Sequence, residues 1–485
     1  MKSIYKLTYI LYTFAVMAML NACADDDSFS SSPSNTLSFS CDTVSLDTVF
    51  STVPSSTRTM WVYNNSGDGL RLSSIKLNNG NQTGFRVNVN GVYLGEAQGY
   101  QISNEEIRKN DSIRVFVEAT LPVNNTDAPQ LVSDDLLFIL ESGVTQKVNL
   151  RAWSWDAELL RDVIVSSDSI IGSEKPTVIY GGITVNPGAT LTIPAGKTLY
   201  MHSGANIDVY GRLVCNGEPG NEVTLRGDRL DNMFDYLKYD GVSGQWGGII
   251  FHTDSYDNII EHTDIHASDD AIVCDSSNTD RQKLTITSST IHNAKGYGLS
   301  ARNSNIDILN TQISNTLGDC INVIGGKMLV NNCTLAQFYP FDARRGDALN
   351  IRDDSTTVAP LDFRIINSIV TGYSQDVVMV NLSDTTKTSN ILFDHCLLRT
   401  PEVDDTLMCR DIIWEDPEDT IVTGWKNFMN IDTENLRYDF RLKPTSLAID
   451  AADPATSLPT DRDATRRDEK PDMGCFEASK EEDKE

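Results

Sequence analysis

Aspartate residues recur at one position of a repeating apolar pattern in the second half of the chain. The pattern places an aliphatic residue at positions 272, 299, 321, 349 and 378, and the residue two positions earlier is an aspartate in four of the five copies. These four are Asp270, Asp319, Asp347 and Asp376, and Tyr297 stands in the fifth copy. Such a column of carboxylates could perform acid–base chemistry, bind a hard cation or cap turns of the chain.

Stacked carboxylates need something that offsets their repulsion. Equivalent atoms of neighbouring parallel strands lie about 5 Å apart, and unscreened carboxylates at that distance raise each other's pKa. A calcium ion bound by Asp270, Asp319, Asp347 and Asp376 would offset the repulsion, because Ca²⁺ takes several oxygen ligands. Each carboxylate could instead accept backbone N–H bonds from its own turn. We favour turn capping, and calcium is the one cofactor that the sequence suggests.

Catalysis by the same column is a third interpretation. Ser268–Ile272 and Gly318–Ile321 are similar to the aspartate segments of β-helical polygalacturonases, which use paired carboxylates as acid and base across a glycosidic bond. The candidate catalytic residues are then Asp269, Asp270, Asp319 and Asp347. The pattern recurs in several copies, which is typical of a structural corner and not of a single active site.

Two further groups of side chains could bind a metal or a sugar. His262, Asp264 and His266 alternate along one predicted strand, so they could face one side together, but such a short trio is a weak signal for a metal site. Aromatic rings in and beside the insertions 226–246 and 335–347 could stack on sugar rings or pack against their own domain. The candidate glycan-binding residues are Tyr236, Tyr239, Trp246 and Tyr339.

The elements that must position these residues form a repeat. Six aliphatic residues occupy matching contexts at intervals of 26, 22, 22, 35 and 28 residues: Ile265, Ile291, Ile313, Leu335, Val370 and Leu398. A repeat near 22 residues with insertions is typical of a β-solenoid, in which each rung covers the one below. The predicted fold class is therefore all-β, with a parallel β-helix over residues 160–440.

Residues just before these six predict corners and interior positions. Three positions earlier stand His262, Ser288, Asn310, Asn332, Asn367 and His395. We expect the asparagines to stack as a ladder in which each side chain bonds its neighbours. Two positions earlier stand Thr263, Ser289, Thr311, Cys333, Ser368 and Cys396, whose parity directs them inward. Cys333 and Cys396 are two rungs apart, which is too far for a disulfide.

The segment 37–155 predicts a separate β-sandwich. Short runs such as 59–63, 85–89 and 113–117 alternate apolar and polar residues, so one face of each strand is buried and the other is wet. Polar turns such as 64–69 separate the runs. About seven strands at this spacing are typical of a sandwich.

The N-terminus predicts a lipoprotein. Lys2 and Lys6 precede an apolar run over 7–20, which is too short for a confident membrane span and ends just before Ala22 and Cys23. This resembles a bacterial lipobox, so residues 1–22 are a predicted signal peptide and Cys23 a predicted lipidation site. Residues 23–36 then form a tether, and their acidic residues 25–27 are similar to surface-export signals of Gram-negative lipoproteins. We expect outer-membrane anchoring with exposure at the cell surface.

The composition restricts what the chain can bind and how its cysteines are used. The chain of 485 residues has 40 Lys and Arg against 68 Asp and Glu, and its net charge is −28. This acidity argues against nucleic-acid binding, which needs a basic surface. The eight cysteines after Cys23 are scattered, which predicts small core residues. The sequence leaves the oligomeric state undetermined.

The C-terminal region carries a specific resemblance. Gly244–Ile249, Ser446–Asp453 and Pro471–Glu477 resemble segments of right-handed parallel β-helix surface lipoproteins of Gram-negative bacteria, with an immunoglobulin-like N-terminal domain and a choice-of-anchor-like C-terminal segment. The resemblance implies the fold and an extracellular setting, with a C-terminal cap over 441–478 and a polar tail over 479–485. It leaves activity open, because β-helices include lyases, glycosidases, adhesins and spacers.

Two functions follow as hypotheses. The first is a non-catalytic surface lipoprotein whose β-helix binds extracellular polysaccharide or serves as a structural or adhesive element. The alternative is a polysaccharide lyase or glycoside hydrolase that acts on acidic glycans through the aspartates of the β-helix.

Overall fold

A computed structural model describes residues 28–234, 236–354, 357–382, 389–406, 408–419 and 421–478. The predicted signal peptide, the lipidation site Cys23 and the tail 479–485 lie outside these residues. The chain divides into two compact units, Met1–Asp156 and Ala157–Glu485. Among the described residues, no helix is both long and apolar enough to cross a membrane.

The first unit packs two sheets around one apolar core. Its five-stranded sheet has the order β1-β3-β9-β5-β6, and its six-stranded sheet has the order β2-β11-β10-β4-β7 with β8 paired to β4. The β11 and β2 pair is parallel, and the other pairs are antiparallel. The elements are β1 (Ser38–Phe39), β2 (Thr43–Phe50), β3 (Arg58–Tyr63), β4 (Leu70–Leu77), β5 (Phe85–Val89), β6 (Val92–Tyr93), η1 (Glu96–Gln98), β7 (Gln101–Ile102), β8 (Glu105–Ile107), β9 (Ser112–Ala119), β10 (Gln130–Leu140) and β11 (Thr145–Trp155).

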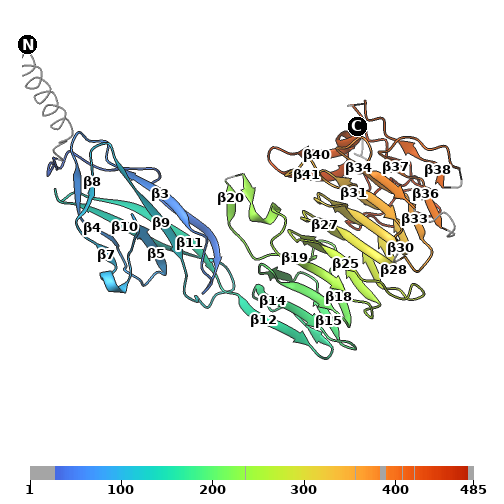
Figure 1. Ribbon diagram of the computed structural model, residues 1–485, viewed down its shortest axis with the longest axis horizontal. Helices are drawn as coiled ribbons and strands as arrows, with labels where there is room; N and C mark the ends of the chain where they lie inside the picture. Colours follow the sequence, from blue (N-terminus) through green and yellow to red (C-terminus); the bar gives the residue numbers. More distant parts are fainter. Residues whose placement is uncertain are drawn as a thin grey trace, which may run out of the picture. The chain divides into compact units, whose positions relative to one another are not determined.

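The second unit is a parallel β-helix. Its 26 strands, β12 to β39 without β20 and β21, belong to one sheet whose strands stack rung on rung (Figure 1). The predicted fold class, all-β with a parallel β-helix, is confirmed. Three stacks of strands run along the unit, and the long strands β12 (Glu158–Val165), β14 (Thr177–Val185), β28 (Leu299–Leu309) and β30 (Ile321–Asn331) each contribute to two of them.

The remaining strands divide among the three stacks. The first stack adds β17 (Asn206–Val209), β22 (Gly248–Phe251), β25 (Ile272–Cys274), β32 (Leu349–Arg352) and β35 (Val378–Asn381). The second adds β13 (Ser169–Ile170), β15 (Thr190–Pro194), β18 (Arg212–Asn216), β23 (Asn258–Glu261), β26 (Leu284–Thr287), β33 (Asp362–Ile366), β36 (Asn390–Asp394) and β38 (Cys409–Arg410). The third adds β16 (Thr198–Met201), β19 (Val223–Gly227), β24 (Thr263–His266), β27 (Thr290–His292), β29 (Gln312–Ser314), β31 (Thr334–Gln337), β34 (Ile369–Gly372), β37 (Leu397–Leu398) and β39 (Ile413–Trp414).

The predicted register of the third stack is confirmed. Ile265 pairs with Ile291, Ile291 with Ile313, and so on through Leu335 and Val370 to Leu398. All six side chains lie in the interior core. The residues two positions earlier, including Cys333 and Cys396, are also fully buried. Every cysteine among the described residues is a free thiol, in agreement with the scattered spacing.

The corner before this stack explains its asparagines. His262, Ser288, Asn310, Asn332, Asn367 and His395 all have positive φ, between 40° and 51°. Asparagine adopts this left-handed conformation more readily than most residues, because its short side chain bonds locally.

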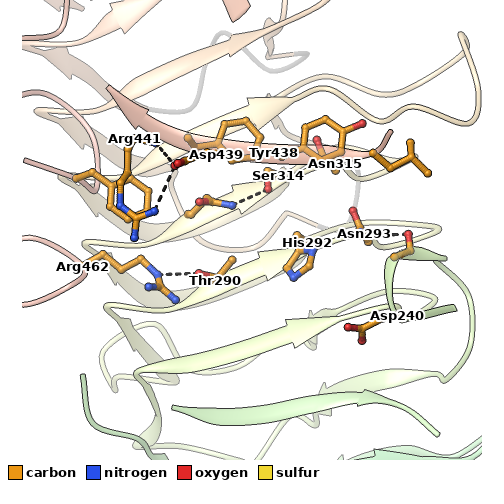
Figure 2. A pocket seen from close by; sticks show the side chains of 15 residues that line it. Asp240, Thr290, His292, Asn293, Ser314, Asn315, Tyr438, Asp439, Arg441 and Arg462 are labelled. Carbon is orange, nitrogen blue, oxygen red and sulfur yellow. Dashed lines mark hydrogen bonds and ion pairs between the residues drawn. The ribbon is translucent and has the colours of Figure 1, made fainter. Parts of the chain in front are cut away.

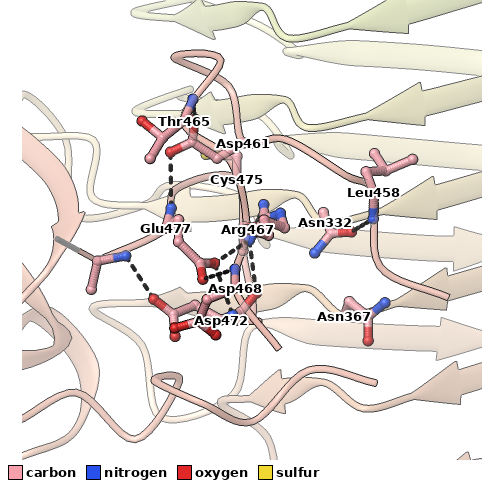
Figure 3. A network of polar contacts seen from close by, with 12 residues as sticks. Asn332, Asn367, Leu458, Asp461, Thr465, Arg467, Asp468, Asp472, Cys475 and Glu477 are labelled. Atoms are coloured by element: carbon pink, nitrogen blue, oxygen red, sulfur yellow. Dashed lines mark hydrogen bonds and ion pairs between the residues drawn. The ribbon is translucent and has the colours of Figure 1, made fainter. Parts of the chain in front are cut away.

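The expected ladder of mutually bonded asparagines is wrong, because residues 453–478, which we call the closing segment, take up their hydrogen bonds. Asn310 donates to the Thr460 carbonyl at 2.7 Å, and Asn332 and Asn367 accept the amides of Leu458 and Asp453 at 2.9 and 2.8 Å. Figure 3 shows the part of the closing segment that contains Leu458 beside Asn332 and Asn367. The asparagines therefore attach the closing segment along the side of the rungs.

The C-terminal region packs on the outside of the third stack. The hairpin of β40 (Phe428–Asp432) and β41 (Arg437–Leu442) follows η3 (Gly424–Asn427). Phe428, Phe440 and Cys475 join Ile369 and Leu397 in a second apolar core of this unit. We call residues 428–478 the cap. A second hairpin, β20 (Asn232–Phe234) with β21 (Leu237–Lys238), leads to η2 (Tyr239–Gly241) in the insertion between β19 and β22.

Candidate functional site

The outward face of the third stack changes from polar to apolar along the rungs. Each interior residue is flanked by two outward residues, which are Asp264 and His266 on β24, then Thr290 and His292 on β27, then Gln312 and Ser314 on β29. On the following rungs the outward residues include Ala336, Ile369 and Leu397, which the cap covers. The cap therefore covers the apolar rungs, and the polar rungs stay open at its edge.

A pocket of about 490 Å³ lies where the polar rungs meet the cap. We call it the cap pocket (Figure 2). The strands β27 and β29 form its floor, η2 contributes one side, and the β41 strand with the closing segment contributes the other. Its lining residues are Asp240, Gly241, Thr290, His292, Asn293, Gln312, Ser314, Asn315, Leu436, Tyr438, Asp439, Phe440, Arg441, Arg462 and Phe476.

An imidazole–carboxylate network lies at the η2 side of the cap pocket. Asp264 Oδ1 lies 2.7 Å from His266 Nδ1 and 3.2 Å from His292 Nε2. The two imidazole rings stack with centroids 4.8 Å apart. His266 is buried, with 7% of its side chain exposed, whereas His292 is 25% exposed and lines the pocket.

The insertion between β19 and β22 completes this network. Asp240 Oδ1 lies 2.7 Å from His266 Nε2 and 2.7 Å from Arg226 Nη1. Burial disfavours the charge of His266, but the two carboxylates outweigh it and raise its pKa to about 9. Burial also opposes ionisation of Asp264, yet the two histidines hold its pKa well below the usual value. Without a bound metal, the network holds His266 as a cation between two anions.

The opposite side of the cap pocket carries two arginines. Arg462 donates from Nε to Thr290 Oγ1 at 2.7 Å, and its Nη1 pairs with Asp463 at 2.8 Å. Arg441 pairs with Asp463 at 2.7 Å and with Asp439 at 3.3 Å. Because carboxylates neutralise both guanidinium groups, the pocket offers directed N–H donors with little net positive charge.

Aromatic and amide groups complete the lining. Tyr438 and Phe440 stack with ring centroids 6.1 Å apart, and Gln312 donates to Ser314 Oγ at 3.0 Å. The Tyr438 hydroxyl and Asn315 Oδ1 are buried polar atoms without a hydrogen-bond partner among the described residues. Buried polar atoms are normally satisfied by protein or water, so these two mark unmet hydrogen-bonding capacity beside the pocket.

The predicted aspartate column exists in the predicted register. Ile272 pairs with Leu299, Leu299 with Ile321, Ile321 with Leu349, and Leu349 with Val378. Three of the four carboxylates accept a backbone N–H bond, which is the type of bond that the capping interpretation predicts. Asp270 accepts the Tyr297 amide at 2.8 Å, Asp319 accepts the Asp347 amide at 2.8 Å, and Asp376 accepts the Val378 amide at 3.2 Å.

Two of these bonds differ from the expected pattern. Asp270 and Asp319 bond the equivalent residue of the next rung instead of their own turn, so the column joins neighbouring rungs. Burial raises the pKa of Asp347 to about 6, and the charges of Asp319 and Asp376 add to the shift. Burial likewise raises the pKa of Asp319, although hydrogen bonds from Asp347 and Asn350 oppose it. The predicted repulsion within the column is therefore present.

The remaining catalytic candidate stands apart from the column. Asp269 has 56% of its side chain exposed, and its carboxylate pairs with Lys295, whose Nζ lies 3.7 Å away. Asp270 and Asp319 are separated by the rung that carries Tyr297. The structure therefore does not bring Asp269, Asp270 and Asp319 together around one point.

The predicted histidine trio is partly wrong. His262 has a φ of 40° and occupies the corner, so it turns away from the strand that carries Asp264 and His266. His292, on the next rung, takes its place. The repeat could have identified His292, because His266 and His292 each directly follow one of the six aliphatic residues that define the register.

Two of the four glycan-binding candidates are core residues. Trp246 has no exposed surface, lies in the interior core and donates Nε1 to the His266 carbonyl at 2.8 Å. Tyr339 is 5% exposed, and its hydroxyl lies 2.8 Å from Ser243 Oγ. No sugar can stack on either ring. Arg229 covers one face of Tyr239 at 3.7 Å, whereas Tyr236 is 60% exposed and stacks on Phe234.

Two groups among the described residues bring three possible metal-ligand atoms within 4.8 Å of one another. They are Asp264 with His266 and His292, and Asp394 with His395 and Asp411. The first borders the cap pocket, and the second lies at the corner of a later rung, where Asp411 is 3.9 Å from His395.

The chain is similar to several solved structures at low sequence identity. No family model matches the sequence, and no curated protein matches it. The crystal structure of pectate lyase Pel9A is 13% identical, with a TM-score of 0.31, over 67% of this chain and 97% of that chain. The catalytic domain of a GH87 α-1,3-glucanase in complex with tetrasaccharides is 10% identical, with a TM-score of 0.20, over 73% and 88%. A PapD-like domain of human CEP192 is 12% identical, with a TM-score of 0.18, over 26% and 91%.

Proposed function

We propose that this protein is a surface-anchored lipoprotein that binds extracellular polysaccharide in the cap pocket. The lipid anchor would be attached at Cys23, in the outer membrane, with the β-helix displayed outside the cell. The lining of the cap pocket is the observation that supports binding. It combines amide, imidazole and guanidinium groups with the ring of Tyr438, and this combination suits a ligand with many hydroxyl groups and apolar ring faces.

The charged residues of the cap pocket restrict the class of glycan that it can bind. Arg441 and Arg462 are already paired with Asp439 and Asp463, and Asp240 adds a further carboxylate. A strongly anionic glycan would meet little unpaired positive charge in this pocket. Neutral or weakly acidic polysaccharides are therefore the class that we propose.

Retardation of the protein in polysaccharide gels tests this function. The mature protein from residue 24 would be run through gels that contain neutral or acidic polysaccharides. We expect Gln312→Ala and Tyr438→Ala to lose retardation at least tenfold, since both side chains line the pocket. Tyr210→Ala is the matched control, because Tyr210 is 41% exposed and stacks on His252 outside the pocket. Equal retardation of all variants would contradict binding in the cap pocket.

A second candidate function is cleavage of an acidic polysaccharide at the aspartate column. One observation favours it, namely that the pKa of Asp347 is about 6 while Asp319 lies on the neighbouring rung. A carboxyl group with a pKa of about 6 is protonated in part of the molecules near neutral pH and can then act as a general acid toward a leaving oxygen. Calcium bound at Asp270, Asp319, Asp347 and Asp376 would belong to this proposal, because it could bridge an acidic glycan to the column.

Product size distinguishes cleavage from binding. Acidic polysaccharides would be incubated with the protein, once with calcium and once with chelator, and their length measured by size exclusion. Cleavage requires shortened chains with the unchanged sequence and intact chains with Asp347→Asn. Asp280→Asn is the control, because this carboxylate is 84% exposed on another part of the β-helix. Intact chains in every condition would rule out this second function.

A further inference from the structure

The network beside the cap pocket has the composition and geometry of a metal site. We infer that Asp264, His266 and His292 bind a divalent transition-metal ion, for which Zn²⁺ is the reference ion. The possible ligand atoms of the three residues all lie within 4.8 Å of one another. Two imidazole nitrogens and one carboxylate oxygen form a recurrent ligand set for catalytic zinc and related ions.

The β-helix register fixes these ligands in place. His266 pairs with His292 across β24 and β27, and Asp264 pairs with Thr290 on the same two strands. Asp264 and His266 are two residues apart, so both side chains project from the same face. Ligands on neighbouring strands of a rigid sheet lose little conformational freedom when a metal binds.

A carboxylate behind one ligand supports the same assignment. His266 turns Nδ1 toward Asp264 and Nε2 toward Asp240, which lies 2.7 Å away. Arg226 holds the same Asp240 oxygen at 2.7 Å. Metal-binding histidines almost always use their second nitrogen in this way, because the bond fixes the ring and its tautomer. The insertion that carries Asp240 thus orients a ligand that it does not itself contribute.

The ligand set also indicates which ion binds and from which side. Imidazole nitrogen favours zinc, copper, nickel and iron over calcium, which prefers oxygen ligands. Three protein ligands leave at least one coordination position open. The side chains of Asp264 and His292 are 32% and 25% exposed, whereas that of His266 is 7% exposed. Of the three ligands, His292 lines the cap pocket, so a water or a ligand oxygen could reach the open position from that pocket.

Zinc binding to the metal-free protein tests the inference. The chain from residue 24 would be treated with chelator, titrated calorimetrically with Zn²⁺ in excess Ca²⁺, and assayed for retained zinc after gel filtration. We expect one equivalent of zinc per chain. Asp264→Asn, His266→Ala and His292→Ala should each weaken binding at least tenfold, and Asp240→Asn should weaken it about 10- to 100-fold as an outer partner does.

The chain is strongly acidic and could bind zinc at other carboxylates, so matched control variants are needed. His202 forms a similar histidine–aspartate pair with Asp228 at 2.6 Å, and no third possible ligand joins this pair among the residues that the structure describes. His202→Ala should therefore bind zinc like the unchanged protein. Melting curves of the metal-free variants separate lost ligands from lost folding. X-ray absorption of the zinc complex should show scattering from two imidazoles. Absence of retained zinc, or equal affinity in all variants, would overturn the inference whether or not the pocket binds glycan.

Discussion

Arg467 and Glu477 form a buried ion pair in which Nη1 lies 3.1 Å from Oε2 and the side chains are 2% and 7% exposed. The same guanidinium donates to the carbonyls of Asp472 and Gly474 and to Asn310 Oδ1 (Figure 3 shows the network around it). This single side chain thus connects residues 472–477 to Asn310 at the corner of the β-helix.

We expect Arg467→Ala to destabilise the β-helix unit by about 3 to 5 kcal/mol, because it leaves Glu477 buried without its partner. Thermal unfolding followed by circular dichroism measures the effect. Arg281→Ala is the control, since Arg281 and Asp257 form a similar pair at 3.1 Å whose side chains are 55% and 60% exposed. That substitution should cost about 1 kcal/mol or less. Equal losses for the two variants would contradict a structural role of the buried pair.

Trp246→Ala should destabilise the protein by about 3 to 5 kcal/mol, since it opens a cavity in the interior core and removes a hydrogen bond to the His266 carbonyl. Tyr236→Ala, at a ring that is 60% exposed, should change stability by about 0.5 kcal/mol or less. Denaturant unfolding of the two variants measures the contrast. A mild effect of Trp246→Ala would mean that this tryptophan is not a core residue.

The corner asparagines allow backbone and side-chain effects to be separated. Asn332 has a φ of 51° and accepts the Leu458 amide. Asn332→Gly keeps the left-handed conformation and removes the hydrogen bond, at a cost of about 1 kcal/mol. Asn332→Ala also adds the left-handed strain of about 1 to 2 kcal/mol. Melting temperatures should therefore fall further for alanine than for glycine, and the reverse order would refute the corner assignment.

The raised pKa of Asp347 makes the free energy of unfolding depend on pH in a defined direction. Folding raises this pKa from 3.8 to about 6, so the folded state binds the proton more tightly than the unfolded state. The free energy of unfolding therefore falls as pH rises from about 4 to about 6 and stays lower above that range. We expect Asp347→Asn to stabilise the protein at pH 7.5 by about 1 to 2 kcal/mol, after allowance for partial exposure, and to have little effect at pH 4.

Melting temperatures at the two pH values measure this difference. Asp280→Asn, which removes a carboxylate that is 84% exposed, is the control variant in both measurements. A gain from Asp347→Asn that is equal at pH 4 and pH 7.5 would contradict the raised pKa.

The sequence by itself determined the rung register of the β-helix. Ile265, Ile291 and Ile313 mark it because interior positions of a solenoid must be apolar on every rung, and this requirement recurs along the chain. The aspartate column followed from the same periodicity, since residues at a fixed offset from the interior position must stack. The alternation in 59–63 and 113–117 likewise identified strands with one buried face.

Only the tertiary structure decided what each outward residue contacts. The repeat places His292 on the outward face of its rung, but its contact with Asp264 of the neighbouring rung, at 3.2 Å, is visible only in the structure. The cap pocket forms because the hairpin Phe428–Leu442 and the η2 segment pack beside β27 and β29. These elements are far apart in the sequence, so local periodicity does not predict their contacts. Trp246 looked like an insertion residue, but burial is decided by packing from all sides. Local periodicity fixes which face a side chain occupies, whereas insertions and the cap decide whether that face is open.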